Sequence, residues 1–205
     1  FCAGGDIVSL YRAMTEPGKL AEGERFFNEE YELDYQIHTY PKPIVCWGNG
    51  IVMGGGIGLM VGASHRVVTE HSKLAMPEVS IGLYPDIGAG WFLNRMPMRT
   101  GLFLGLTGAR MNGADALFVN MADRFISHGL KDQVVDALKA ADWQRAEAQA
   151  VVSAVLRQFE QQSREAIPAS PVREHFEDIQ QATDADSLEQ VVAQLGELGA
   201  REDWL

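Results

Sequence analysis

Short apolar runs alternate with longer stretches of helical spacing along the first part of the chain. The short runs are typical of buried strands, and the longer stretches space their apolar residues as an amphipathic helix does. Strands are expected at residues 44–47, 65–70, 73–76 and 123–126. Helices are expected at residues 7–14, 24–39, 55–63, 91–95, 100–107 and 114–119, the last capped by Asn112. This alternation up to residue 128 predicts an α/β fold.

Loops and a second region follow from the same pattern. Residues 16–23 and 81–90 are rich in glycine and proline and predict irregular loops. After residue 129 glycine becomes scarce and the spacing becomes helical, with helices expected at residues 144–162, 174–181 and 187–195. The pattern therefore divides the chain into an α/β region, residues 1–128, and a helical region, residues 129–205.

Composition narrows the classes of function that fit this fold. The 205 residues carry a formal net charge of −11, which argues against a nucleic-acid partner because phosphate binding needs clustered Lys and Arg. No apolar run approaches the ~18 residues of a membrane span, so no membrane partner is expected. Two cysteines, Cys2 and Cys46, are too few for a disulfide framework and fit a reducing compartment. The histidines lack metal-ligand spacing, so no metal site is expected.

Three consecutive glycines, Gly54, Gly55 and Gly56, stand between the expected strand at 44–47 and the expected helix at 55–63. Glycine loses much backbone entropy on folding, so such a run indicates a local requirement. One interpretation is a close approach of the backbone to a ligand, with N–H groups at a helix N-terminus facing negative charge. The other is a tight strand-to-helix turn. The triplet alone fits both.

Two acidic residues, Glu78 and Asp86, each follow a proline in an otherwise apolar stretch. Burial there would raise the pKa of either carboxyl and suit it to acid, base or nucleophilic chemistry. The alternative is that both residues cap local turns. Glu29, Glu30 and Tyr31 lie in an expected helix, where paired glutamates are more typical of a solvated surface.

Three ordered blocks, taken together, resemble the crotonase (enoyl-CoA hydratase/isomerase) superfamily. They are residues 1–6, Phe-Cys-Ala-Gly-Gly-Asp; residues 42–56, which include the glycine triplet; and residues 75–86, which include both acids. The resemblance implies a crotonase-like spiral of ββα units with a helical C-terminal region. It also implies that the first strands of the fold lie upstream of Phe1, so that residues 1–128 form a partial acyl-CoA-binding core.

Within the superfamily, the sequence is most similar to the 3-hydroxyisobutyryl-CoA hydrolase branch. Met76-Pro77-Glu78 followed by residues 82–88 has the pattern of that branch, and residues 27–31 resemble its substrate-facing helix. Gly58 stands where a hydratase carries its first catalytic glutamate, which disfavours hydration by two glutamates. The resemblance implies hydrolysis of a short-chain 3-hydroxyacyl-CoA, 3-hydroxyisobutyryl-CoA of valine catabolism above others, to the free acid and CoA.

The resemblance also implies roles for individual residues. Glu78 corresponds to the central catalytic carboxylate and Asp86 to its partner. The backbone N–H groups of Gly5 and Gly55 correspond to the oxyanion hole, and Glu30 to a substrate-binding acid. Ala3 and Asp6 flank the acyl-CoA pocket.

No cofactor is implied, since coenzyme A is part of the substrate. A homo-oligomer is compatible with the resemblance, and the implied location is the bacterial cytoplasm or the mitochondrial matrix.

Two alternative functions stay open at this point. The first is an enoyl-CoA hydratase or isomerase, which Gly58 weakens but Glu78 permits. The second is a non-catalytic acyl-CoA-binding or protein-binding module, which predicts that Glu78 and Asp86 do not converge on the glycine amides.

Overall fold

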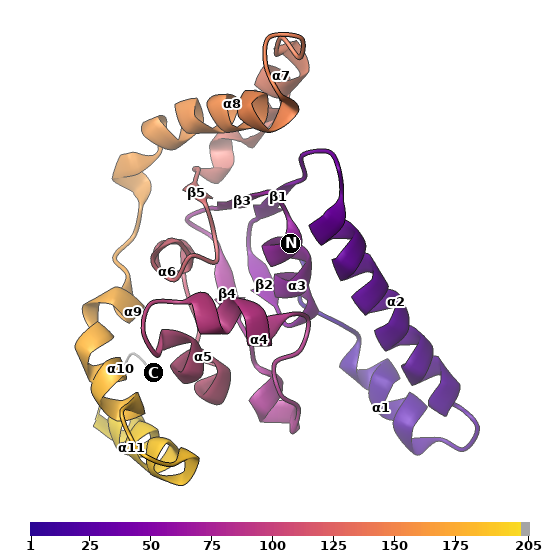
Figure 1. The fold of residues 1–205 in the computed structure, drawn as a ribbon, viewed down its shortest axis with the longest axis vertical. Helices are drawn as coiled ribbons and strands as arrows, with labels where there is room; N and C mark the ends of the chain where they lie inside the picture. The colour runs from indigo at the N-terminus through magenta and orange to yellow at the C-terminus, as the bar shows by residue number, and fades with distance from the viewer. Residues whose placement is uncertain (202–205) are drawn as a thin grey trace.

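Parallel strands form the centre of the molecule (Figure 1), and the computed structural model describes residues 1–201. The first sheet has the order β1-β3-β5, and the second pairs β2 with β4. All three strand pairings are parallel. The strands are β1 (Val45–Gly48), β2 (Ile51–Met53), β3 (His65–Val68), β4 (Lys73–Ala75) and β5 (Arg124–Phe125).

Each pass of the chain adds one strand to each sheet. β1 leads into β2 and then into helix α3 (Gly55–Gly62), after which β3 and β4 repeat the same two positions one step further on. The register pairs Val45 with His65 in the first sheet and Ile51 with Lys73 in the second. This arrangement is the predicted spiral of ββα units, and the predicted α/β fold is confirmed.

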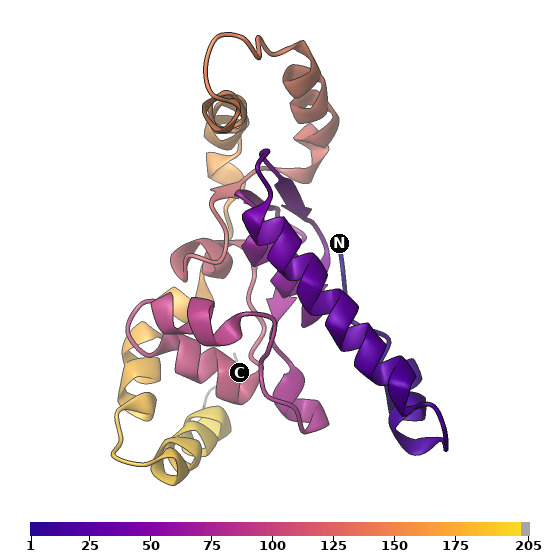
Figure 2. The same ribbon diagram turned by 45° about the vertical axis from the view of Figure 1, so that its right-hand side comes forward.

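Helices surround the strands on three sides (Figures 1 and 2). α1 and α2 form an arm along one side, α7 and α8 lie at one end, and α10 and α11 lie at the other. The remaining α-helices are α1 (Ile7–Thr15), α2 (Leu20–Thr39), α4 (Ala89–Phe92), α5 (Thr100–Thr107), α6 (Gly113–Phe118), α7 (Lys131–Ala140), α8 (Ala148–Gln162), α9 (Pro171–Glu174), α10 (Phe176–Thr183) and α11 (Leu188–Arg201). Short 3-10 helices are η1 (Glu78–Ile81), η2 (Leu93–Arg95), η3 (His128–Leu130) and η4 (Arg164–Ala166).

Three boundaries differ from the sequence-based expectation. The loop expected at residues 16–23 ends sooner, because α2 already begins at Leu20. Gly23 is buried inside that helix, where an added Cβ would lie 3.6 Å from the Cβ of Ala13, so this glycine marks the packing of α2 on α1. The pattern also missed α7, of which only Val134 is fully buried, and it began α8 four residues too early.

The hydrophobic core has two parts. The larger cluster extends from the strands to the C-terminal helices, which contribute Val172, Ile179 and Leu195. The smaller cluster joins Val67 of β3 to Leu156 of α8. Helices beyond residue 129 therefore pack on the strand core at two places. The division of the chain at residue 128 stays a prediction.

One buried carboxylate ties the C-terminal helices to the core. Asp115 is 1% exposed and completes the expected cap of α6, where its Oδ2 accepts from the Asn112 amide at 2.9 Å. Its Oδ1 accepts from the Ser170 hydroxyl at 2.7 Å and from the Val172 amide at 3.0 Å. The start of α9 is therefore held by the same side chain that caps α6.

The strand register decides where candidate chemistry lies. Gly54 follows β2, and Glu78 follows β4 after two residues. Because β2 and β4 are parallel neighbours, their carboxyl ends meet at one edge, and the residues that follow them come together. Within residues 1–201, the helices include none long and apolar enough to cross a membrane.

Candidate active site

The glycine triplet is required by the backbone that it forms. Gly54 has a φ of +53°, which favours glycine, and its amide donates to the Ala75 carbonyl of β4 at 3.2 Å. At Gly56, a Cβ would overlap the carbonyl group of Cys2, which runs parallel to β2. The triplet is thus a tight strand-to-helix turn, with a neighbouring segment packed against it.

Two backbone amides beside this turn have no acceptor. Gly55 is the first residue of α3, so its N–H takes part in no bond within the helix. Throughout residues 1–201, neither the Gly55 amide nor the Gly5 amide donates a hydrogen bond to the protein. Both residues line the same cavity. Two N–H groups are therefore available to an oxygen atom bound there.

This cavity, which we name the catalytic cavity, has a volume of about 150 Å³. Its walls come from residues 3–5, from α1 and α2, from the glycine turn, and from the segment between Pro77 and Asp86. Each site residue that the sequence analysis named lines it: Gly5, Glu30, Gly55, Glu78 and Asp86. The structure therefore brings together residues that are far apart in the sequence.

Glu78 enters the cavity from the start of η1. It is buried, at 7% exposure, and its Oε2 has no hydrogen-bond partner among the described residues. Its Oε1 faces the glycine turn, 3.2 Å from where a Cβ of Gly54 would lie. Burial, with a smaller contribution from the charge of Asp86, raises the pKa of the Glu78 carboxyl. A buried carboxyl with an open oxygen is suited to proton transfer or nucleophilic attack.

Glu30 reaches the cavity from α2. Its Oε1 occupies the space beside Gly55, where an added Cβ would overlap it. Burial, followed by the charges of Asp86, Asp34 and Glu78, raises the pKa of Glu30 to about 7. The neighbouring Glu29 points to solvent and pairs with Arg25 at 3.8 Å. The structure thus separates two glutamates that the helical pattern treats alike.

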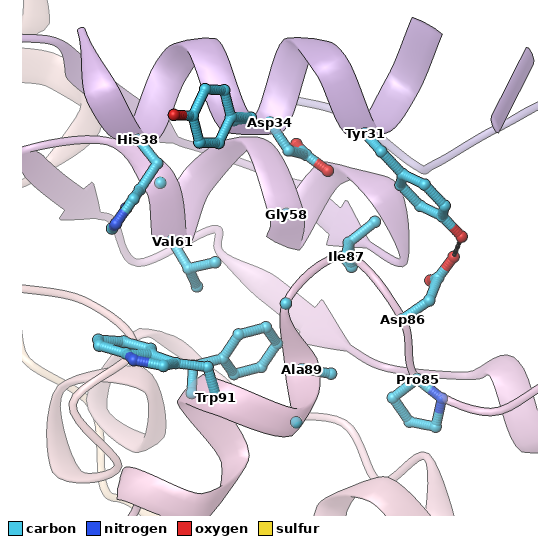
Figure 3. Close-up of a pocket in the computed structure, with 15 residues that line it drawn as sticks. Tyr31, Asp34, His38, Gly58, Val61, Pro85, Asp86, Ile87, Ala89 and Trp91 are labelled. Carbon is cyan, nitrogen blue, oxygen red and sulfur yellow. Dashed lines mark hydrogen bonds between the residues drawn. The ribbon is translucent and has the colours of Figure 1, made fainter. Parts of the chain in front are cut away.

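Asp86 is held by a residue that the sequence analysis did not assign to the site. The Tyr31 hydroxyl donates to Asp86 Oδ2 at 2.5 Å (Figure 3). Burial and this hydrogen bond raise the pKa of the Tyr31 phenol. The turn that was the alternative role of Asp86 uses its carbonyl oxygen, which accepts from the Ala89 amide at 2.6 Å. The carboxylate is therefore left to Tyr31 and the cavity.

The residue after Asp86 has an unusual backbone. Ile87 has a φ of +41°, a conformation that β-branched residues rarely adopt. Its side chain is buried, and a Cβ at Gly58 would lie 2.8 Å from the Ile87 Cβ. The absence of a side chain at Gly58 is what allows Ile87 to pack here. Backbone strain of this kind is concentrated at functional sites.

Asp34 is a second residue that the sequence analysis missed. Both its carboxyl oxygens are buried and have no partner among the described residues, and a Cβ at Gly58 would lie 3.0 Å from Oδ2. Burial, together with the charge of Asp86, raises the pKa of Asp34 to about 6. Asp34 lies four residues after Glu30 on α2, a spacing that places both on one helix face. That spacing was the available signal.

The two flanking residues behave differently. Ala3 lines the catalytic cavity, as expected. Asp6 instead caps α1, where its carboxylate accepts from the Val8 amide at 3.0 Å and from the Ser9 hydroxyl at 2.7 Å. Over residues 1–201, His, Cys, Asp and Glu side chains form no group of three or more that would hold a metal ion.

Similarity to known proteins agrees with this geometry. The sequence matches the family described as enoyl-CoA hydratase/isomerase over residues 1–205. It is 40% identical over 207 residues to the mitochondrial 3-hydroxyisobutyryl-CoA hydrolase of Danio rerio, covering 98% of this chain and 51% of that protein. It is 48% identical over 128 residues to the enzyme of the same name from Xenopus tropicalis, covering 62% of this chain and 32% of that protein.

Solved structures show the same fold. A carnitinyl-CoA dehydratase from Mycobacterium thermoresistibile superposes with a TM-score of 0.81 at 38% identity, covering 98% of this chain and 54% of that one. An enoyl-CoA hydratase from Rhodobacter sphaeroides gives 0.73 at 33% identity, covering 97% and 57%. The chain spans about half the length of the full-coverage curated relative, 51%. The match over the whole sequence, together with the ββα spiral, shows that the chain belongs to the enoyl-CoA hydratase/isomerase family, the crotonase superfamily.

Proposed function

We propose that the protein hydrolyses a short-chain 3-hydroxyacyl-CoA thioester, 3-hydroxyisobutyryl-CoA above others, to the free acid and CoA. The observation that carries this proposal is the convergence of two carboxyl groups, Glu78 and Asp86, and two open amides on one small cavity. A non-catalytic binding module predicts no such convergence. The curated relatives of Danio rerio and Xenopus tropicalis, named as 3-hydroxyisobutyryl-CoA hydrolases, support the substrate.

The two amides would hold the thioester oxygen. During hydrolysis this oxygen becomes negatively charged, and the N–H groups of Gly5 and Gly55 would then donate to it. Removing one such donor typically costs about 3 kcal/mol of transition-state stabilisation. Because neither amide is bonded within residues 1–201, no internal acceptor has to be displaced.

Glu78 would carry the bond-making step by one of two routes. In the first, its carboxylate attacks the carbonyl carbon, CoA leaves as the thiolate, and water then hydrolyses the mixed anhydride. In the second, it takes a proton from a water molecule that attacks the same carbon. In either route Asp86, held by Tyr31, would orient the water or supply a proton to the thiolate.

Glu30 would recognise the acyl group. Its carboxyl lies against Gly55, next to the proposed site of the thioester oxygen, and burial raises its pKa to about 7. A carboxyl at this place can hydrogen-bond the 3-hydroxyl of the substrate. This contact would favour hydroxyacyl over plain acyl thioesters.

Coenzyme A enters this reaction as part of the substrate, and no separate cofactor is proposed. We also propose a homo-oligomer located in the mitochondrial matrix or the bacterial cytoplasm. The name of the Danio rerio relative, which includes the word mitochondrial, supports the first of these locations.

Hydration of an enoyl-CoA is the second candidate, and one observation favours it. Gly58 supplies no acid, but the Asp34 carboxyl from α2 lies 3.0 Å from where a Cβ of Gly58 would be. A second carboxyl is therefore close to the position at which a hydratase carries one. Hydrolysis remains the main proposal because Asp34 lies outside the catalytic cavity.

The test compares two reactions in one set of variants. Thiol release from 3-hydroxyisobutyryl-CoA measures hydrolysis, and loss of the conjugated-double-bond absorbance of crotonyl-CoA measures hydration. Glu78→Gln should lower thiol release by about a thousandfold or more while acyl-CoA binding stays measurable. Glu29→Gln, the matched change at an exposed position, should leave the rate unchanged.

Two results would contradict the proposal. Near-normal thiol release by Glu78→Gln would remove Glu78 from the chemistry. Hydration of crotonyl-CoA faster than any thiol release would favour the hydratase. A further variant, Glu30→Ala, should lose more activity on hydroxyacyl than on plain acyl thioesters, and equal losses would remove the proposed hydroxyl contact.

A further inference from the structure

A second cavity, larger than the catalytic one, meets it at Asp86. Its volume is about 550 Å³, against about 150 Å³ for the catalytic cavity. It lies between α2, α3 and residues 85–92 (Figure 3). The lining is mainly apolar, with side chains of Tyr35, Val61, Pro85, Ile87, Trp91 and Phe92. Both its size and its lining are typical of a site for an apolar group.

The boundary between the cavities is made by one hydrogen-bonded pair. Asp86 lines both cavities, whereas the consecutive helical residues Glu30 and Tyr31 line the catalytic and the second cavity respectively. The Tyr31 ring extends from α2 toward Asp86, and its hydroxyl reaches Oδ2 at 2.5 Å (Figure 3). This pair bridges the gap between the helix and the loop.

The loop side of this boundary is rigid. Ile87 is buried beside Asp86, and its contact with Gly58 leaves no room for the loop to move toward α3. On the helix side, the Tyr31 ring packs against Phe27, with ring centroids 6.0 Å apart, but 43% of Tyr31 is exposed. The Tyr31 side chain is therefore the removable part of the boundary.

We propose that Tyr31 is the specificity-determining residue of this site: its hydrogen bond to Asp86 closes the catalytic cavity off from the second cavity and so restricts the protein to short acyl groups. This inference rests on the proposed function and deepens it. The catalytic cavity of about 150 Å³ has the volume of about five water molecules, which suits a four-carbon acyl group. The ligand class that would extend into the second cavity is a longer, apolar acyl chain.

The test is a chain-length panel of 3-hydroxyacyl-CoA thioesters, with four to ten acyl carbons, assayed by thiol release. The parent protein should prefer the four-carbon substrate. In Tyr31→Ala the ratio of kcat/KM for the eight-carbon over the four-carbon substrate should rise by tenfold or more, about the effect of one newly accommodated methylene group or several. Tyr31→Leu, which keeps a larger helix-forming side chain, should shift the ratio in the same direction and serves if Tyr31→Ala does not fold.

Two matched variants separate the roles of ring, hydroxyl and cavity size. Tyr31→Phe keeps the ring, so the chain-length preference should stay, while kcat falls about tenfold with KM unchanged because Asp86 loses a charge-assisted hydrogen bond. Tyr35→Ala enlarges the second cavity without opening the boundary. Tyr35 is 69% exposed, and its hydroxyl has no hydrogen bond among the described residues, so its chain-length preference should equal that of the parent.

A binding measurement gives a readout that does not depend on turnover. Trp91 lines the second cavity, so octanoyl-CoA should change the tryptophan fluorescence of Tyr31→Ala and leave that of the parent unchanged. Trp91→Phe in the Tyr31→Ala background should abolish the change. An unaltered chain-length preference in a folded, active Tyr31→Ala would overturn the inference. Absence of thiol release by the parent from every thioester would instead refute the proposed function.

Discussion

Glu30 makes the folded protein less stable as the pH rises, and Glu30→Gln should remove this effect. The carboxyl is half-buried beside Gly55, and its pKa is raised from 4.5 to about 7. Between these two pH values the folded state holds a proton that the unfolded state has released. The free energy of unfolding therefore falls as the pH rises from about 4.5 to about 7, and then levels off.

The magnitude follows from the size of the shift. A rise from 4.5 to about 7 corresponds to an upper limit of about 3.4 kcal/mol, at 1.36 kcal/mol for each pH unit. Because Glu30 is only half-buried, solvent and salt screen its charge, and we expect about 1 to 2 kcal/mol. Glutamine has almost the same shape but cannot ionise, so Glu30→Gln should gain this amount relative to the parent at high pH.

Urea unfolding at pH 5 and pH 8 measures the effect directly. Between these two values the parent should lose about 1 to 2 kcal/mol more than Glu30→Gln, equivalent to a few degrees in Tm for a chain of this size. Glu29→Gln, the same change at an exposed neighbour, should follow the parent. If the parent and Glu30→Gln show the same pH dependence, the reasoning from burial and like charge is refuted.

Two further predictions concern packing away from the reacting atoms. Gly58→Ala should destabilise the protein by about 1–3 kcal/mol in urea unfolding, because its Cβ would lie 2.8 Å from the Cβ of buried Ile87. The control Gly196→Ala, where a Cβ would meet nothing within 4 Å in α11, should be neutral or stabilising, and equal losses in the two variants would contradict this account. Asp115→Ala should cost about 3 kcal/mol or more, because three hydrogen-bond donors lose a buried charged acceptor; a loss below about 1 kcal/mol would mean that Asp115 does not hold α9.

Local signals predicted much of the fold. Apolar runs located β1, β3, β4 and β5 to within a few residues, and the Asn112 cap of α6 was predicted from its residue type. The errors came where tertiary packing competes with local preference. Gly23 was assigned to a loop, although it allows α1 and α2 to pack closely. The polar sequence of α7 gives only one fully buried side chain, so its periodicity is weak.

For the candidate site, local sequence located chain positions but not contacts. The order of the three motif blocks, through resemblance to the family, pointed to Gly5, Gly55 and Glu78. That both acids line one cavity with the open amides depends on the parallel register of β2 and β4 and on the position of α2 across them. Neither is encoded in any single segment.

Sequence by itself determined the α/β pattern, the glycine turn and the acids that follow it, because these depend on local backbone geometry and on residue type. Only the tertiary structure decided which acids matter together. It turned Glu30 inward and Glu29 outward, placed the Asp34 carboxyl over Gly58, and joined Tyr31 to Asp86 across 55 positions of sequence. The physical reason is that burial and neighbouring charge, which set the pKa of a carboxyl, come from segments that meet only when the chain is folded.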